Sequence, residues 1–262
     1  MKEFFLDQLG RNIAIPNSPK RVISLVPSIT ELLIDLGLEQ SLVGRTKFCV
    51  HPKSLRQSVS IVGGTKQIHF DRIAALKPDL IIANKEENDK GQIEQLAMEY
   101  PVWISDIPNF EAALTMIKGV GEILRKEAKS LSIINQSRQL VATLSNSQPK
   151  KVAYLIWRNP YMTIGKDTYI HDMLRLTGFE NIYGEQTRYP TFTIADLQKR
   201  QPEMLLLSSE PFPFKQKHIA ELATDFPTIP IVLVDGEAFS WYGTRFLKTF
   251  DYLTEVRRQT EK

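Results

Sequence analysis

The stretch FDRIAALKPDLII, residues Phe70–Ile82, decides how the chain folds because it holds a short helix, a stop signal and a buried strand in succession. Pro78 cannot continue a helix, and it also keeps the residue before it out of the helical region. The apolar run that follows Pro78 is typical of a strand covered on both faces. The stretch therefore predicts a helix that leads into a parallel sheet.

The same arrangement returns in TIADLQKRQPEMLL, residues Thr193–Leu206. Elsewhere, short apolar and β-branched runs alternate with helical patterns, which indicates an α/β fold with parallel sheets. The predicted strands are Arg21–Val26, Asp79–Ala83, Val102–Ser105, Lys151–Ile156, Glu203–Leu207 and Ile229–Asp235. The predicted helices are Ile29–Leu36, Asp71–Leu76, Lys90–Tyr100, Thr168–Thr177, Thr193–Lys199 and Gly243–Arg258.

Two local signals add detail near the amino terminus. Residues Phe4–Ile15 predict a hairpin that turns at Gly10, whose backbone is permissive. Ser28 and Glu31 form an S-x-x-E pattern, which predicts a capping box at the start of the first helix.

The middle of the chain has no strand signal from Asn109 to Ser145. Apolar periodicity there predicts one helix from Glu127 to about Leu144, roughly 27 Å long at 1.5 Å per residue. Gly119 and Gly121 are expected to interrupt or end the helix before it, and Ser145–Pro149 has loop composition. The chain is therefore predicted to have an N-terminal lobe with a leading hairpin (residues 1–122), a bridging helix (123–148) and a C-terminal lobe (149–262).

Composition and charge exclude several classes of protein. The 262 residues carry 33 Lys and Arg against 30 Asp and Glu, and this net charge of +3 does not predict a nucleic-acid-binding protein. The single cysteine excludes an intrachain disulfide. The sequence MKEFFLD shows no signal peptide, and no apolar run reaches the ~20 residues that span a bilayer. Either a leader is missing from the chain or the protein stays in the cytoplasm.

The two helix–proline–strand stretches, together with RVISLVPS (Arg21–Ser28) and VGGT (Val62–Thr65), resemble the helical-backbone substrate-binding proteins of ABC importers. The resemblance covers about residues 8–257, and that family handles cobalamin, iron–siderophore complexes and haem. The cobalamin branch is most similar, on Gly44–Pro52 and on Asn159–Asp167. The resemblance implies two Rossmann-like lobes with central, mostly parallel sheets, bridged by one long backbone helix, with the ligand in the cleft between the lobes.

Aromatic residues in three loops mark the expected ligand site. The loops are Phe48–His51 after the second-strand region of the first lobe, Trp157–Tyr161 after the strand Lys151–Ile156, and Phe239–Gly243 after the strand Ile229–Asp235. Rigid aromatic rings suit a large flat ligand, although they could instead close the core at the sheet edge. Two arginines near these loops could pair with ligand carboxylates, or could be solvated or bonded to loop carbonyls. The predicted ligand-binding residues are Phe48, Cys49, Trp157, Arg158, Tyr161, Trp241, Tyr242 and Arg245.

The resemblance also implies a permease-docking acid on each lobe, seven residues before the proline. Asp71 occupies this position in the first lobe, whereas the second lobe has Ala195 there and Asp196 one place later. One residue rotates a helical side chain by about 100°. Asp71 and Asp196 are the predicted docking residues, and the offset of Asp196 leaves room for a homologue without a permease.

No catalytic site, metal site or resident cofactor is predicted. Cys49 and His51 are too few for a metal site, and Gly165–Thr168 lacks the spacing of a P-loop. The acids Glu86, Glu87 and Asp89 are interpreted as a solvated face. The predicted function is a monomeric, non-enzymatic receptor for a corrinoid, haem or iron chelate, periplasmic by family expectation. The alternatives are a cytoplasmic ligand carrier or sensor and an α/β enzyme that uses the same cleft.

Overall fold

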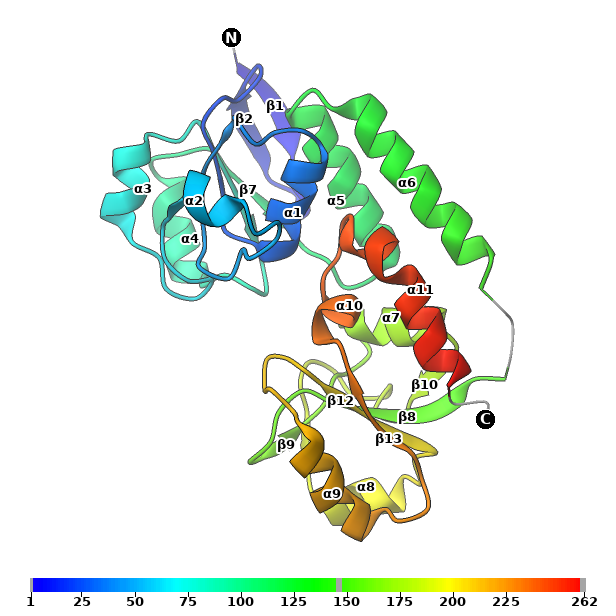
Figure 1. The fold of residues 1–262 in the computed structure, drawn as a ribbon. Helices are drawn as coiled ribbons and strands as arrows, with labels where there is room; N and C mark the ends of the chain where they lie inside the picture. Colours follow the sequence, from blue (N-terminus) through cyan, green and yellow to red (C-terminus); the bar gives the residue numbers. More distant parts are fainter. Residues whose placement is uncertain (1, 145–147, 260–262) are drawn as a thin grey trace. The chain divides into compact units, whose positions relative to one another are not determined.

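The computed structural model describes residues 2–144 and 148–259, which form two compact units (Figure 1). The first unit comprises the chain up to Ile107, together with Glu111–Ser137 and Tyr242–Arg245. The second comprises Pro108–Phe110, Arg138–Trp241 and the chain from Phe246 onward. The sequence did not indicate that residues 242–245 group with the first unit.

The first unit is built on a parallel sheet in the order β5-β4-β3-β6-β7. Alternate residues of its strands pack against α3 and α4 on one face, while α1 and α5 lie on the other face (Figure 1). The strands are β3 (Val22–Ser24), β4 (Leu42–Arg45), β5 (Ser60–Ile61), β6 (Leu80–Asn84) and β7 (Val102–Ser105). The helices are α1 (Pro27–Asp35), α2 (Leu55–Ser58), α3 (Phe70–Leu76), α4 (Lys90–Ala97) and α5 (Phe110–Ile123).

The predicted hairpin is confirmed as β1 (Lys2–Leu6) paired antiparallel with β2 (Asn12–Pro16). Gly10 has φ of 78° in the turn, a left-handed conformation that glycine adopts without steric cost. The backbone N–H of Gln8 donates to the carbonyl of Ile104 over 3.1 Å. The hairpin thus covers part of the outer edge of β7, which would otherwise present unpaired backbone groups.

The second unit has a parallel sheet in the order β10-β8-β12-β13. Helices α8 and α9 pack on one face through an apolar cluster, and α7 and α10 lie on the other (Figure 1). A short antiparallel pair, β9 (Tyr161–Met162) and β11 (Thr191–Phe192), follows β8. The remaining elements are β8 (Lys150–Leu155), β10 (Phe179–Asn181), β12 (Met204–Ser208), β13 (Ile231–Val234), α7 (Tyr169–Leu176), α8 (Ile194–Lys199), α9 (Gln216–Asp225), α10 (Gly236–Ser240) and α11 (Arg245–Arg258).

Helix α6 (Glu127–Ala142) begins at the predicted residue, and the boundary between the units falls after Ser137 within it. The expected interruption at Gly119 and Gly121 is wrong, because α5 runs through both glycines to Ile123. A Cβ at Gly121 would lie 2.2 Å from Ser130 Oγ on α6. This glycine therefore permits a close approach between two helices. The loop predicted at Ser145-Asn146-Ser147 lies outside the described residues.

The predicted capping box at the first helix is also wrong. Helix α1 begins at Pro27, one residue before Ser28, with Val26 as the N-cap residue and no side-chain cap. Proline is favoured at the first helical position because its fixed φ suits the helix and its missing N–H costs no hydrogen bond there. Both Ser28 and Glu31 therefore lie inside the helix, and both are buried.

All six predicted strands are present, to within about two residues at each end. The sequence missed β4, β5, β9, β10 and β11, and also the helices α2, α9 and α10. None of the helices within residues 2–144 and 148–259 is long and apolar enough to cross a bilayer.

Candidate functional site

The carboxyl ends of parallel strands meet at one edge of a sheet, where α/β proteins bind their ligands. In the first unit this edge carries Phe48, which lies in the connection after β4 and is 48% exposed. Lys47 Nζ lies 5.0 Å from the centre of the Phe48 ring, and a Cβ at Gly64 would lie 3.3 Å from that ring. Phe48 therefore rests on Gly64 and presents much of its ring to solvent.

Cys49, the next residue, is fully buried. Thr30 Oγ1 donates to its sulfur over 3.1 Å, and Thr46 Oγ1 lies 3.2 Å from the sulfur. Burial raises the pKa of the thiol, which keeps the sulfur protonated. Cys49 therefore belongs to the core of the first unit, and its sulfur has no accessible surface for a ligand.

Two further predicted residues belong to the first unit although they come late in the chain. The hydroxyl of Tyr242 donates to Glu87 Oε1 over 2.9 Å, and burial raises the pKa of this phenol. Arg245 Nε donates to Glu31 Oε2 over 2.9 Å, with side chains only 12% and 5% exposed. Both side chains are therefore held by acids of their own unit. The interpretation of Glu87 as part of a solvated face is wrong for that residue.

In the second unit, Trp157 follows β8 at the carboxyl edge of the sheet and is 40% exposed. Its ring meets Phe212 edge to face, with 5.8 Å between the ring centres. The neighbouring Arg158 forms an ion pair with Glu221, with 2.7 Å between Arg158 Nη2 and Glu221 Oε2. The indole is thus supported from one side and open on the other.

Tyr161 on β9 is half-buried and stacks on Phe192, with ring centres 5.8 Å apart and an interplanar angle of 17°. Trp241 ends helix α10 and is 9% exposed. Phe239, within α10, is fully buried against Tyr154 and closes the core.

The structure adds Glu210, a residue that the sequence reasoning missed. Its carboxylate accepts a 2.8 Å hydrogen bond from Ser240 Oγ. Burial raises the pKa of this carboxyl. The only sequence signal is its position, two residues beyond the buried strand β12.

The two predicted docking acids differ in their surroundings. Asp71 is an exposed residue at the second position of α3, and Ala195 occupies the second position of α8. Asp196, at the third position of α8, forms a capping box with Thr193, whose N–H and Oγ1 donate to it over 3.1 and 2.6 Å. These hydrogen bonds lower the pKa of Asp196. Its carboxylate is therefore directed to its own helix terminus.

The predicted site residues fall into two sets. Phe48, Cys49, Tyr242 and Arg245 lie in the first unit, and Trp157, Arg158, Tyr161 and Trp241 lie in the second. Among the residues that the structure describes, no group of three or more His, Cys, Asp or Glu side chains could hold a metal ion.

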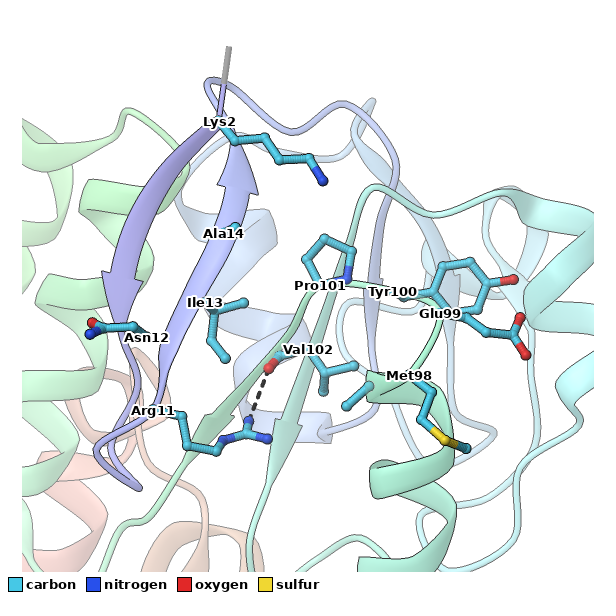
Figure 2. Close-up of a pocket in the computed structure, with 11 residues that line it drawn as sticks. Lys2, Arg11, Asn12, Ile13, Ala14, Met98, Glu99, Tyr100, Pro101 and Val102 are labelled. Carbon is cyan, nitrogen blue, oxygen red and sulfur yellow. Dashed lines mark hydrogen bonds between the residues drawn. The ribbon is translucent and has the colours of Figure 1, made fainter.

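A pocket of about 360 Å³ opens in the first unit between β2 and the connection from α4 to β7 (Figure 2). Arg11 lines this pocket, and its guanidinium donates a hydrogen bond to the carbonyl of Val102, the first residue of β7. The pocket therefore lies at the amino end of this strand, opposite the edge that carries Phe48. None of the predicted ligand-binding residues lines it.

Comparison with solved structures gives the same fold. The periplasmic vitamin B12 binding protein BtuF of Vibrio cholerae has a TM-score of 0.79 at 21% identity, with 94% of this chain and 100% of that chain covered. The periplasmic heme binding protein HutB of Vibrio cholerae has a TM-score of 0.75 at 23% identity, with 90% and 98% covered.

Sequence comparison also finds relatives of this chain. The chain is 26% identical over 212 residues to the uncharacterized ABC transporter substrate-binding lipoprotein YvrC of Bacillus subtilis (strain 168), covering 76% of this chain and 67% of that protein. It is 29% identical over 195 residues to the vitamin B12-binding protein of Yersinia pestis (strain Pestoides F), covering 72% and 69%. The periplasmic binding protein family model matches residues 22–228. Because this match spans most of the sequence, the chain belongs to the periplasmic binding protein family.

Proposed function

We propose that the protein is the substrate-binding component of an ABC importer and binds a corrinoid such as cobalamin, or else haem or an iron chelate. The observation that carries the proposal is the exposed indole of Trp157 at the carboxyl edge of the second sheet, in edge-to-face contact with Phe212. Relatives described as a vitamin B12-binding protein and as a lipoprotein of ABC transport support the substrate class and the cell envelope as its location.

The binding residues that we propose are those with exposed or partly exposed rings or charges at the strand ends. Flat tetrapyrrole-like ligands gain most from such surfaces, because rigid rings offer apolar area at a small entropic cost. Cys49, Tyr242 and Arg245 are engaged within the fold, and we assign them to the support of the binding loops. The proposed contacts are Phe48, Trp157, Arg158 and Tyr161, and Trp241, which is 9% exposed, belongs with the supporting residues.

Titration of the purified protein with cyanocobalamin, haemin and a ferric hydroxamate tests the proposal, with tryptophan quenching and visible absorption as readouts. Trp157→Ala removes one stacking surface and should weaken binding about 5- to 150-fold. Phe4→Ala is the matched control, because Phe4 is an exposed aromatic residue of the hairpin, away from the strand ends. If none of the three compounds binds the wild type at high micromolar concentration, the assigned ligand class is wrong.

The permease-docking role belongs to Asp71, because Asp196 caps its own helix. Uptake of the bound compound by cells of the native host should fall in Asp71→Asn, while the affinity of the purified protein for that compound stays the same. Asp196→Asn should affect uptake less. Equal uptake by wild type and Asp71→Asn would remove the docking role, and recovery of the native protein from the cytosol would favour an intracellular carrier.

A further inference from the structure

We propose that Arg45 is a positioning residue, whose buried guanidinium holds the turn that carries Phe48 in place for ligand contact. Arg45 is the last residue of β4 and is 2% exposed. The inference rests on the proposed function, in which Phe48 is one of the binding residues. Every contact that carries it lies within the first unit.

Phe48 lies in a tight turn that directly follows β4. The backbone N–H of Cys49 donates to the carbonyl of Thr46 over 3.2 Å, which closes the turn around Lys47 and Phe48. Phe48 therefore occupies the third of the four turn positions. Its ring is 48% exposed, so packing holds only part of the ring, and the backbone of the turn decides where the ring lies.

The guanidinium of Arg45 joins both ends of this turn. Its Nη1 donates to the carbonyl of Thr46 and to that of Cys49, over 3.2 Å in each case. Its Nε donates to the carbonyl of Leu55, at the start of α2, over 3.3 Å. One side chain thus binds the connection after β4 at three points, two of which flank Phe48. A guanidinium suits this role because its donors point in fixed directions.

The charge of Arg45 makes these hydrogen bonds necessary. The side chain is buried, and no acidic side chain of the described part of the chain forms an ion pair with it. The carbonyl oxygens of the connection therefore compensate the charge, and opening of the turn would strand a buried cation.

A further hydrogen bond holds the turn from the segment after β5. The N–H of Lys47 donates to the carbonyl of Gly63 over 2.8 Å. The turn is thus fixed through its own backbone and through the Arg45 side chain before any ligand arrives. A contact residue that is held in place in advance lowers the entropic cost of binding.

A double-mutant cycle separates positioning from general stabilisation. Arg45→Met removes all three hydrogen bonds and should weaken binding of cyanocobalamin or haemin, whichever the wild type binds, by about tenfold. In a Phe48→Ala background, Arg45→Met should have almost no further effect, because the ring that it positions is gone. Additive losses would overturn the inference.

A second measurement needs no ligand and therefore separates failure of this inference from failure of the proposed function. The amide proton of Cys49 closes the turn, and its exchange with solvent should accelerate by about tenfold or more in Arg45→Met. The amide of Ile81, which donates to the carbonyl of Pro101 in the same unit, should accelerate less. Equal acceleration at both amides would mean that Arg45 only stabilises the unit as a whole, and would overturn the inference.

Two further variants complete the exchange experiment. Arg45→Lys keeps a buried cation and serves if Arg45→Met does not fold; its ammonium cannot replace both Nε and Nη1, so the Cys49 amide should still exchange faster. Arg21→Met is the matched control, because it removes another arginine–carbonyl hydrogen bond of this unit, from Arg21 Nε to Leu76, and should leave the Cys49 amide unchanged. An unchanged Cys49 rate in the Arg45 variants would refute the inference, even if every ligand experiment agreed with the proposed function.

Discussion

The hydroxyl of Tyr242 donates a hydrogen bond of 2.9 Å to Oε1 of Glu87, a residue 155 positions earlier in the chain. The contact lies inside the first unit, although the residues on both sides of Tyr242–Arg245 belong to the second. Burial and the neighbouring carboxylate both raise the pKa of the phenol, which therefore stays protonated and remains a donor. A late segment of the chain is thus tied to the loop after β6.

Tyr242→Phe removes this donor and leaves the shape of the ring intact. Because the acceptor is a carboxylate, the variant should lower the free energy of unfolding by about 1.5–3 kcal/mol. Urea unfolding of Tyr242→Phe, Glu87→Gln and the double variant measures the coupling. Losses that simply add would mean that the hydrogen bond contributes nothing of its own.

The pair of Arg245 and Glu31 gives a second prediction. The two side chains are 12% and 5% exposed, so Arg245→Met strands a buried carboxylate and should cost about 3–5 kcal/mol. Replacing both residues, in Glu31→Leu with Arg245→Met, removes the stranded charge and should recover most of that loss. Thermal and urea unfolding would show this. A double variant as unstable as the single one would mean that the pair does more than compensate charge.

The elements that the sequence predicted well are those with an unbroken apolar run. β6 and β7 are fully buried and were placed to within about one residue. β4 (Leu42–Arg45) was missed because it includes a glycine and an arginine. The guanidinium of Arg45 is buried there, and it donates to the carbonyls of Thr46 and Cys49 over 3.2 Å. Such satisfaction of a buried charge depends on the three-dimensional fold.

The candidate site follows the same logic. Trp157 was found because it directly follows the predicted strand Lys151–Ile156, whereas Phe48 was placed only after a second-strand region without predicted bounds. Glu87 stands among acids and looked solvated, and Glu210 carried no motif. Each acid has its partner far along the chain, and only the fold brings the two together.

Glu210 should also leave a signature in the pH dependence of stability. Burial is the largest cause that raises its pKa above 4.5, and Glu237 and Asp235 add to the rise, while the hydrogen bond from Ser240 opposes it. Above pH 4.5 the folded state therefore keeps this proton while the unfolded chain loses it, so this group makes stability fall as pH rises.

The measurement is the free energy of unfolding of wild type and Glu210→Gln between pH 4 and pH 8, compared as a difference. Gln cannot titrate, so the wild type should lose stability relative to Glu210→Gln as pH rises through this window. The comparison cancels Asp196, whose lowered pKa has the opposite effect. A difference that does not change with pH would show that the carboxyl titrates normally in the folded protein.

The last prediction concerns Gly121, where the gain in helix stability from an added Cβ competes with a steric overlap between that Cβ and Ser130. Replacing a helical glycine with alanine stabilises a helix by roughly 0.5–1 kcal/mol when there is space. At Gly121 the new Cβ would lie 2.2 Å from Ser130 Oγ and 2.5 Å from Ser130 Cβ, so α5 and α6 must move apart. Overpacking of this kind costs about 1–3 kcal/mol, and Gly121→Ala should therefore destabilise the protein.

Gly91→Ala is the control, because a Cβ there meets only Asp89 Oδ1 at 3.5 Å, an ordinary contact at the start of α4. Thermal unfolding should show a lower midpoint for Gly121→Ala and an equal or higher one for Gly91→Ala. A rise in both midpoints would mean that the two helices separate at little cost.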